Sequence, residues 1–215
     1  RYCPNSFRSF GNFSTQNDDP KIFNSTLMKK LVPTIIFILL LVGCKGQIQE
    51  KKTPQKPLKV ESLIGEEGET VILGYMNRAN LDTPEFQAWF QPEYNNIKIP
   101  EGWSAEYAPL AKNLEFKLFL GTWCGDTQRE LGGMFKLLDL LGVSNDKIEM
   151  YSISEAKDSP LSYEKEYDIL NIPTLIFIEN GKEINRFVEF PVVNLVDDFS
   201  KILKREPYEN SYADF

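Results

Sequence analysis

The chain has 215 residues, with 24 Lys and Arg against 31 Asp and Glu, and a net charge of −7. It contains no histidine, which excludes Cys–His and Ser–His catalysis and histidine-ligated metal sites. Gly-rich phosphate-binding loops are also missing from the sequence, since the pair at 132–133 follows no such signature.

The first 27 residues are rich in Asn, Ser, Phe and Asp and show neither a helical nor a strand period. The chain begins with Arg1 rather than Met. We interpret residues 1–27 as a non-native segment upstream of a true start at Met28, and assign no role to Cys3. The alternative is a functional N-terminal arm.

A short basic segment at Met28 leads into an apolar run over residues 31–42, which ends in Leu-Val-Gly and then Cys44. A dozen apolar residues are too few to span a bilayer core, which takes roughly 17–25. The ending resembles the bacterial lipoprotein signal box, in which the cysteine is lipidated and becomes the new N-terminus. This resemblance implies a signal peptide over 28–43, lipidation of Cys44 and anchoring to a bacterial membrane in the cell envelope, facing the periplasm or the exterior. An ordinary cleaved signal and a membrane-spanning anchor are the alternatives.

Residues 44–62 are polar and rich in Lys, Gln and Pro, which indicates a flexible tether. Such a basic tether either touches anionic head groups or is a plain solvated spacer. After cleavage at Cys44 the chain would keep 19 Lys and Arg against 29 Asp and Glu, a net charge of about −10. This balance argues against nucleic acid as a partner, because nucleic acid requires a basic surface.

The folded part is expected to span residues 63–206 and to be followed by a tail at 207–215, which either docks or stays loose. Residues 70–75 predict a strand. Thr83 followed by Pro84 predicts the start of a helix. The buried face of that helix would carry Phe86, Trp89 and Phe90.

Residues 94–103 are typical of a loop, and residues 104–114 predict a second short helix that is capped by Ser104. The segment 63–113 is therefore expected to be a strand–helix extension on the N-terminal side of a core at 114–206. Extensions of this kind cover a sheet edge or shape a nearby site, and covering an edge is the more common reason.

The apolar run at 117–120 ends in a glycine and predicts a buried strand. A helical pattern follows, with apolar residues three and four apart at Leu131, Met134, Phe135, Leu138 and Leu141. Cys124 lies where the strand turns into the helix, so the first-turn amides and the helix dipole would favour a thiolate. Asp126 opposes this by like charge, although acids are common in the first turn of any helix. We therefore expect a modestly activated thiol.

The C-terminal part predicts further elements. Alternation over 147–154 indicates a strand, and Ser159-Pro160 marks a possible helix start. Pro173 leads into a short apolar strand at 175–178, and the Asn-Gly pair at 180–181 predicts a hairpin. A final helix would bury Val193, Leu195, Val196, Phe199, Ile202 and Leu203.

The Trp-Cys-Gly motif at Cys124, placed after an apolar strand, resembles the active-site turn of the thioredoxin family. The Ile-Pro-Thr motif at Pro173 resembles that family's cis-proline loop, and the matching order of elements covers residues 114–204. The resemblance implies an α/β thioredoxin-like fold with a central mixed sheet flanked by helices. It also implies that Cys124 is the catalytic residue, and that the backbone of Ile172 can pair with an incoming peptide. The expected substrate groove consists of Trp123, Gly125, Asp126, Thr127, Ile172 and Pro173.

The sequence departs from the dithiol members of this family at Thr127, which occupies the position of their second cysteine. An intramolecular disulfide at the site is therefore impossible. The buried acid of those members is also missing, with Leu118 at its expected position. Thr127 either donates a hydrogen bond to the sulfur or only fills the vacated position. Arg129 either compensates charge locally or belongs to a solvated helix surface, and the solvated surface is the more common role.

With Cys44 lipidated, Cys124 is the single free thiol of the mature chain, which leaves no cysteine cluster for zinc or an iron–sulfur centre. We expect no metal and no other cofactor. The leading hypothesis is a membrane-anchored thiol–disulfide oxidoreductase without a resolving cysteine. Its partners would be envelope proteins that carry disulfides or thiols, or a small-molecule thiol.

The alternative hypothesis is a non-catalytic module that binds peptides or proteins. A cluster-sharing monothiol glutaredoxin is disfavoured by the exported location and by the Trp before the cysteine. A peroxiredoxin is disfavoured because Lys117 and Gly121 stand where that family has Pro and Thr or Ser.

Overall fold

The computed structural model describes residues 60–213, except 66–67, 158 and 160–161, and these residues form one compact unit. The expected upstream segment 1–27, the signal peptide 28–43 and Cys44 lie outside the described residues. Most of the expected tether 44–62 lies outside them as well. The first strand begins at Glu61, so the folded part starts two residues earlier than the predicted boundary.

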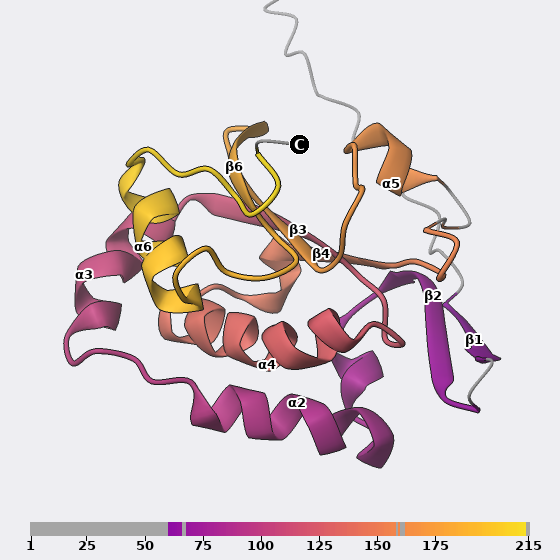
Figure 1. Ribbon diagram of the computed structural model, residues 1–215. Coiled ribbons are helices and arrows are strands. Elements are labelled where there is room, and N and C mark those ends of the chain that lie inside the picture. The colour runs from indigo at the N-terminus through magenta and orange to yellow at the C-terminus, as the bar shows by residue number, and fades with distance from the viewer. Residues whose placement is uncertain (1–59, 66–67, 158, 160–161, 214–215) are drawn as a thin grey trace, which may run out of the picture. The chain divides into compact units, whose positions relative to one another are not determined.

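Six strands form one mixed sheet in the order β1-β2-β4-β3-β5-β6 (Figure 1). The central pair β3 and β4 is parallel and every other neighbouring pair is antiparallel, which confirms the predicted mixed sheet. The strand bounds are β1 Glu61–Ile64, β2 Thr70–Met76, β3 Leu114–Leu120, β4 Ile148–Ser152, β5 Thr174–Glu179 and β6 Lys182–Val188.

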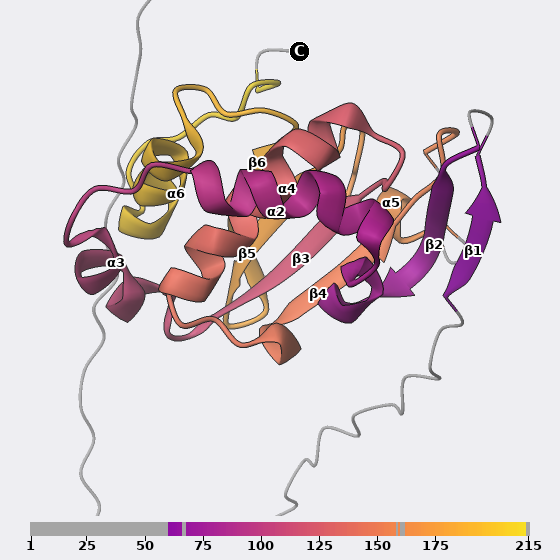
Figure 2. The ribbon, with the colours of Figure 1, turned by 90° about the horizontal axis from the view of Figure 1, so that it is seen from below.

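Helices cover the sheet unequally. The bounds are η1 Arg78–Leu81, α2 Pro84–Asn96, α3 Trp103–Ala111, α4 Gly125–Leu140, η2 Asn145–Lys147, α5 Tyr163–Glu166 and α6 Leu195–Lys204. Helices α2, α4 and α6 lie on one side of the sheet, and α2 runs alongside α4 (Figure 2). Within the residues that the structure describes, no helix has the length and hydropathy needed to cross a bilayer.

Strand β3 separates two hydrophobic clusters because its side chains alternate between the faces of the sheet. Phe116, Leu118 and Leu120 belong to the larger cluster under α2, α4 and α6. Phe119 belongs to the smaller cluster on the opposite face, which also contains Cys124. Leu118 stands at the position expected for the buried acid of the dithiol members, and its apolar side chain is fully buried.

The N-terminal extension corrects two predictions. Thr83 caps α2 as expected, with its Oγ1 accepting a hydrogen bond from the Phe86 amide at 3.4 Å. However, α2 continues through Pro92 to Asn96, where a loop was predicted, because its aromatic face packs along α4. Helix α3 begins at Trp103, and Ser104 is not its cap, since the Ser104 hydroxyl donates to the Leu140 carbonyl at 2.5 Å.

The C-terminal half matches the sequence more closely. Asn180 and Gly181 have φ values of 53° and 74° and connect β5 to β6, which confirms the hairpin. Helix α6 begins at Leu195 with Asn194 as its cap, so Val193 precedes the helix and is 60 % exposed rather than buried. The helix expected after Ser159 is short and spans only α5.

Candidate functional site

Cys124 is the N-cap residue of α4 and lies at the end of a tight turn from β3. Its amide donates to the Gly121 carbonyl at 3.0 Å, which sets the direction in which the helix leaves the strand. The side chain is 8 % exposed. Its position at the helix start is the predicted one, but its Sγ makes no capping hydrogen bond to the first-turn amides, because the thiol donates instead to the Ile172 carbonyl at 3.6 Å.

The Ile172–Pro173 peptide bond is cis, as the sequence predicted. This loop therefore presents the Ile172 carbonyl to the sulfur, while Ile172 itself is only 4 % exposed. The Ile172 amide has no hydrogen-bond acceptor in the part of the chain that the structure describes. The Pro173 carbonyl accepts from the Glu189 amide at 2.7 Å, which ties the loop to the end of β6. We call Trp123–Thr127 together with Ile172 and Pro173 the Cys124 site.

Trp123 and its neighbour Thr122 fix the turn to other strands. The Trp123 indole donates to the Ile153 carbonyl at 2.9 Å, just beyond β4. The Thr122 hydroxyl accepts from the Ile72 amide at 3.1 Å and donates to the Thr70 carbonyl at 3.2 Å. Strand β2 of the N-terminal extension thus supports the cysteine turn. No motif in the sequence indicated this role for Thr122.

Thr127 is fully buried, and its hydroxyl does not bond to the sulfur. The Oγ1 atom instead accepts from the Gly121 amide at 3.4 Å, so Thr127 stabilises the same turn that positions Cys124. An added Cβ at Gly125 would meet no heavy atom within 4 Å, so this side of the turn is open.

The charges in the first turns of α4 compensate each other. Arg129 donates to the Asp126 carboxylate at 2.5 Å and to Glu130 at 2.8 Å, so it compensates charge locally, the less favoured of its two expected roles. The bonds to Glu130 and then Asp126 raise the pKa of the Arg129 guanidinium. Glu130 is 6 % exposed, and burial raises the pKa of its carboxyl despite the pairing with Arg129.

An aromatic cluster lies on the cysteine's face of the sheet. The ring of Tyr151 stacks on Phe119 with centroids 5.1 Å apart and contacts Tyr163 at 4.7 Å. The Tyr151 hydroxyl donates to Glu149, which also pairs with Lys117. Burial, reinforced by the Glu149 carboxylate, raises the pKa of Tyr151 far above its ordinary value, so the phenol stays protonated. The ion pair between Lys117 and Glu149 lies beside this aromatic cluster.

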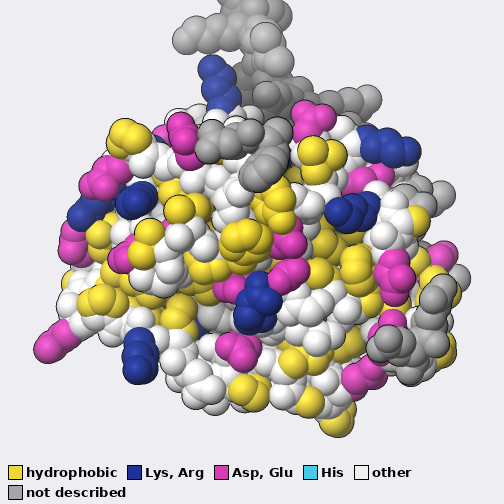
Figure 3. All heavy atoms as spheres, viewed as in Figure 1, with side chains coloured by type: hydrophobic (Ala, Val, Ile, Leu, Met, Phe, Trp, Pro, Cys, Tyr) yellow, Lys and Arg dark blue, Asp and Glu magenta, His cyan; other side chains and the backbone are white. Residues whose placement is uncertain are grey.

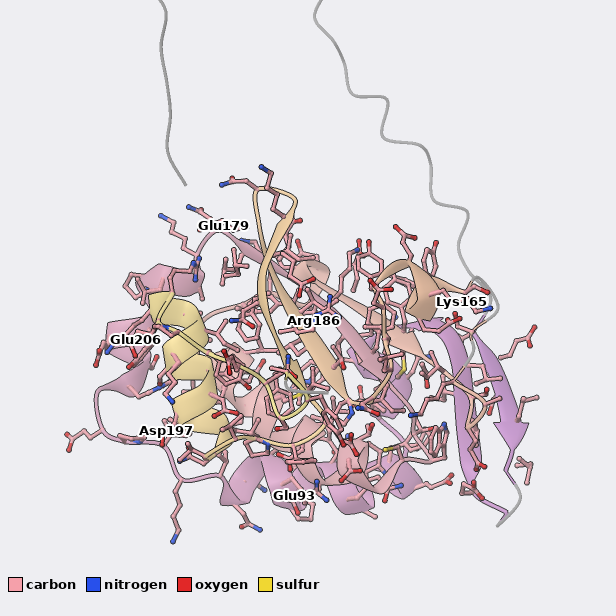
Figure 4. The ribbon with its side chains drawn as sticks, turned by 45° about the horizontal axis from the view of Figure 1, so that its top comes forward. Glu93, Lys165, Glu179, Arg186, Asp197 and Glu206 are labelled. Carbon is pink, nitrogen blue, oxygen red and sulfur yellow. The ribbon has the colours of Figure 1, made fainter. Side chains whose placement is uncertain are left out.

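Other cavities lie away from the sulfur. A hollow of about 600 Å³ separates α2, α4 and the start of α6, and Glu93 and Asp197 flank it from α2 and α6 (Figure 4). Its lining includes Glu130 but not Cys124. Within residues 60–213, where described, no cluster of three or more Cys, Asp or Glu could hold a metal ion.

No protein-family model and no curated protein matches the sequence. Among solved structures, a protein of unknown function from Pseudomonas aeruginosa is 14 % identical with a TM-score of 0.46, covering 61 % of this chain and 91 % of that one. Thioredoxin from Fasciola hepatica is 21 % identical with a TM-score of 0.27, covering 40 % of this chain and 80 % of its own. Mitochondrial thioredoxin 3 from Saccharomyces cerevisiae is 18 % identical with a TM-score of 0.27, covering 44 % and 84 %.

The order and direction of the strands decide the fold. A parallel β3–α4–β4 unit carries the cysteine turn, and the cis-proline leads into the antiparallel β5–β6 hairpin and then α6. The fold is thioredoxin-like. The extra strands β1 and β2 extend the sheet beyond β4, which is the N-terminal extension predicted from the sequence.

Proposed function

We propose that the protein takes part in thiol–disulfide exchange through Cys124 alone. The Cys124 thiolate attacks one sulfur of a substrate disulfide, a new S–S bond joins it to the substrate, and the other substrate sulfur leaves as a thiolate. A second thiol, from the substrate or from a small molecule, then attacks this mixed disulfide. It restores the Cys124 thiol and becomes oxidised in its place.

One observation carries this proposal: the sulfur of Cys124 stands at the start of a 16-residue helix and faces the cis-proline loop at 3.6 Å. Loss of the thiol proton breaks the bond to the Ile172 carbonyl. The freed sulfur can then turn to the unpaired amides of the first turn of α4, which favour negative charge. The open side of the turn at Gly125 leaves space for the substrate sulfur.

Cell-envelope location and membrane anchoring through Cys44 are part of the same proposal. They are supported by the sequence 28–44, which lies outside the described residues. Expression of the chain from Met28 in a bacterium should place the protein in the membrane fraction, and Cys44→Ala should release it from that fraction. Equal membrane recovery of both proteins would rule out the lipid anchor.

The chemistry is tested by mixing the protein with a cysteine peptide held in a mixed disulfide with thionitrobenzoate. We expect release of thionitrobenzoate and a covalent adduct between the peptide and Cys124, both absent in Cys124→Ser. Ser144→Ala, which changes an exposed side chain beyond α4, should react as the wild type does. Failure of the wild type to form an adduct would overturn the proposal.

The second candidate is a non-catalytic binding module, and the low exposure of Cys124 favours it. In that case the unpaired Ile172 amide would pair with a peptide backbone without any exchange of disulfides. Cys124→Ala separates the two candidates, because it would leave peptide binding unchanged in a binding module but would abolish covalent capture in an exchange protein.

A further inference from the structure

The C-terminal tail, residues 207–213, docks on the domain and lies beside β6 (Figures 1 and 2). Its first half is held firmly at Tyr208. The Tyr208 hydroxyl donates to the fully buried Asp198 carboxylate at 3.0 Å, and its carbonyl accepts from the Asn185 side chain at 3.1 Å. Asp198 also accepts from the Val192 amide at 2.8 Å. One buried carboxylate therefore joins the tail to the loop 189–193 that follows β6.

The second half of the tail reaches the residues that flank the Cys124 site. The Ser211 hydroxyl donates to the Phe190 carbonyl at 2.6 Å, and the Tyr212 ring meets the Phe190 ring edge-on at 5.9 Å. The Tyr212 hydroxyl donates to the Glu189 carboxylate, and this bond, together with burial, raises the pKa of Tyr212 to about 12.

These contacts connect the tail to the cis-proline side of the Cys124 site. Glu189, the acceptor for Tyr212, donates its amide to the Pro173 carbonyl at 2.7 Å. Phe190, which holds Ser211 and Tyr212, directly follows Glu189 in the chain. Tyr212 therefore stands close to the cis-proline loop.

The packing under the second half of the tail is loose. A hollow of about 410 Å³ lies between the tail and the loop, lined by Phe190, Pro191, Val192 and Asn210 among others. Phe190 and Val192 are 41 % and 52 % exposed, so the tail does not seal this apolar surface. The tail is therefore anchored at Tyr208 and packed less closely beyond it, where residues 209–211 and Ala213 line the hollow.

We propose that the tail is a strap that limits the access of polypeptide substrates to Cys124. In the closed position Tyr212 joins the tail to Glu189 beside the cis-proline. A polypeptide that pairs along the cis-proline loop breaks this contact and lifts the tail about its anchor at Tyr208. The proposal rests on the proposed exchange chemistry of Cys124, and it predicts that small reagents reach the sulfur more easily than polypeptides do.

The test compares the wild type with Tyr212→Ala and with a chain that ends at Glu206. Two probes are used: iodoacetamide, and the cysteine peptide joined to thionitrobenzoate. We expect the peptide to react about fivefold faster with Tyr212→Ala, the factor that corresponds to one hydrogen bond of ordinary strength. The truncated chain should react at least as fast, while the rate with iodoacetamide should change little in either variant.

Glu209→Ala is the matched control, because Glu209 is an exposed residue of the same tail and should leave both rates unchanged. Thermal unfolding checks that Tyr212→Ala keeps the fold, as expected with the Tyr208 anchor intact. Equal peptide rates in wild type, Tyr212→Ala and the truncated chain would overturn the strap. Rates that rise by the same factor with both probes would also overturn it, since this indicates general loosening. A peptide that forms no adduct with any of the proteins, while iodoacetamide does, would overturn the proposed function itself.

Discussion

In the proposed exchange, Thr127 decides which steps Cys124 can complete without a second thiol. The side chain is fully buried at the third position after the cysteine, and its hydroxyl is used by the Gly121 amide. It therefore stabilises the turn but, because it has no sulfur, it cannot form a disulfide bond with Cys124. Residues three apart in a helix have Cα atoms about 5 Å apart, which lies within the range of Cα separations found in disulfides.

Thr127→Cys should consequently create a dithiol site. We expect the two thiols to form an intramolecular disulfide in mild oxidant, because Cys124 and residue 127 share one turn at the start of α4. Thiol titration before and after oxidation measures this directly. Two free thiols after oxidation would show that the side chain at 127 points away from the sulfur too rigidly to bridge.

Glu130 gives a prediction about pH. Burial raises the pKa of this carboxyl in the folded protein. Its contribution to stability is therefore present below the pKa of the unfolded chain and is lost as the pH rises through the folded pKa. Glu130→Gln should raise the free energy of unfolding relative to wild type at pH 7, and the difference should shrink toward pH 4.

Urea unfolding of both proteins at the two pH values measures this effect. Glu101→Gln, at an exposed position, serves as the control and should leave the stability nearly unchanged. A Glu130→Gln protein that is less stable than wild type at pH 7 would show that the ion pair with Arg129 outweighs the cost of burial.

Local patterns in the sequence were enough to predict the residues that the fold places together at the site. Cys124 follows an apolar strand and Pro173 precedes one, and each pattern is readable within a dozen residues. The supporting contacts of Thr122 and Tyr212 were not predictable. Thr122 contacts Thr70, 52 residues away, and the contacts of Tyr212 depend on the path of the tail. Neither contact produces a periodic pattern in the sequence.

At the scale of elements, the packing of α2 on α4 explains why α2 is longer than predicted. The two helices approach closely at Gly132, where an added Cβ would lie 2.4 Å from the Phe90 carbonyl and 2.6 Å from the Tyr94 amide. Aromatic residues of α2 continue this contact beyond Pro92, with the Tyr94 hydroxyl donating to Asp139 at 2.8 Å. Tertiary contacts of this kind override a local helix-breaking signal.

Gly132→Ala should therefore destabilise the domain by about 1–3 kcal/mol, because the clash is with backbone atoms of α2 that cannot rotate away. Gly125→Ala on the same helix is the matched control. It meets no heavy atom within 4 Å and should be neutral or slightly stabilising. The midpoints of urea unfolding compare the two, and equal values would mean that α2 shifts to accept the methyl group.

On the scale of the whole molecule, charge is distributed unevenly along the chain. Residues 60–215 carry 28 Asp and Glu against 14 Lys and Arg, a net charge of −14. Apolar side chains are exposed between the charged ones on the face seen in Figure 3. A field of this sign attracts cationic ligands and repels anionic ones, and salt screens both effects.

We therefore expect opposite salt responses from two peptide disulfides that differ only in their flanking residues. Raising the ionic strength should slow capture of a Lys-flanked peptide by Cys124 and speed capture of a Glu-flanked one, by up to about tenfold. Capture rates at low and high salt measure this. The same response from both peptides would show that local contacts, rather than the net charge, govern approach.

A threonine in place of the second sulfur has a consequence for how the protein is studied. In the proposed exchange, a domain without a second cysteine cannot release its own covalent partner, so a partner that has no second thiol stays bound until an outside thiol arrives. The lifetime of such a mixed disulfide is then set by the concentration of free thiols in the surroundings rather than by the chain itself. Where free thiols are scarce, these mixed disulfides should accumulate. Acid quenching of wild-type cells should therefore allow the natural partners to be isolated without an engineered trapping variant.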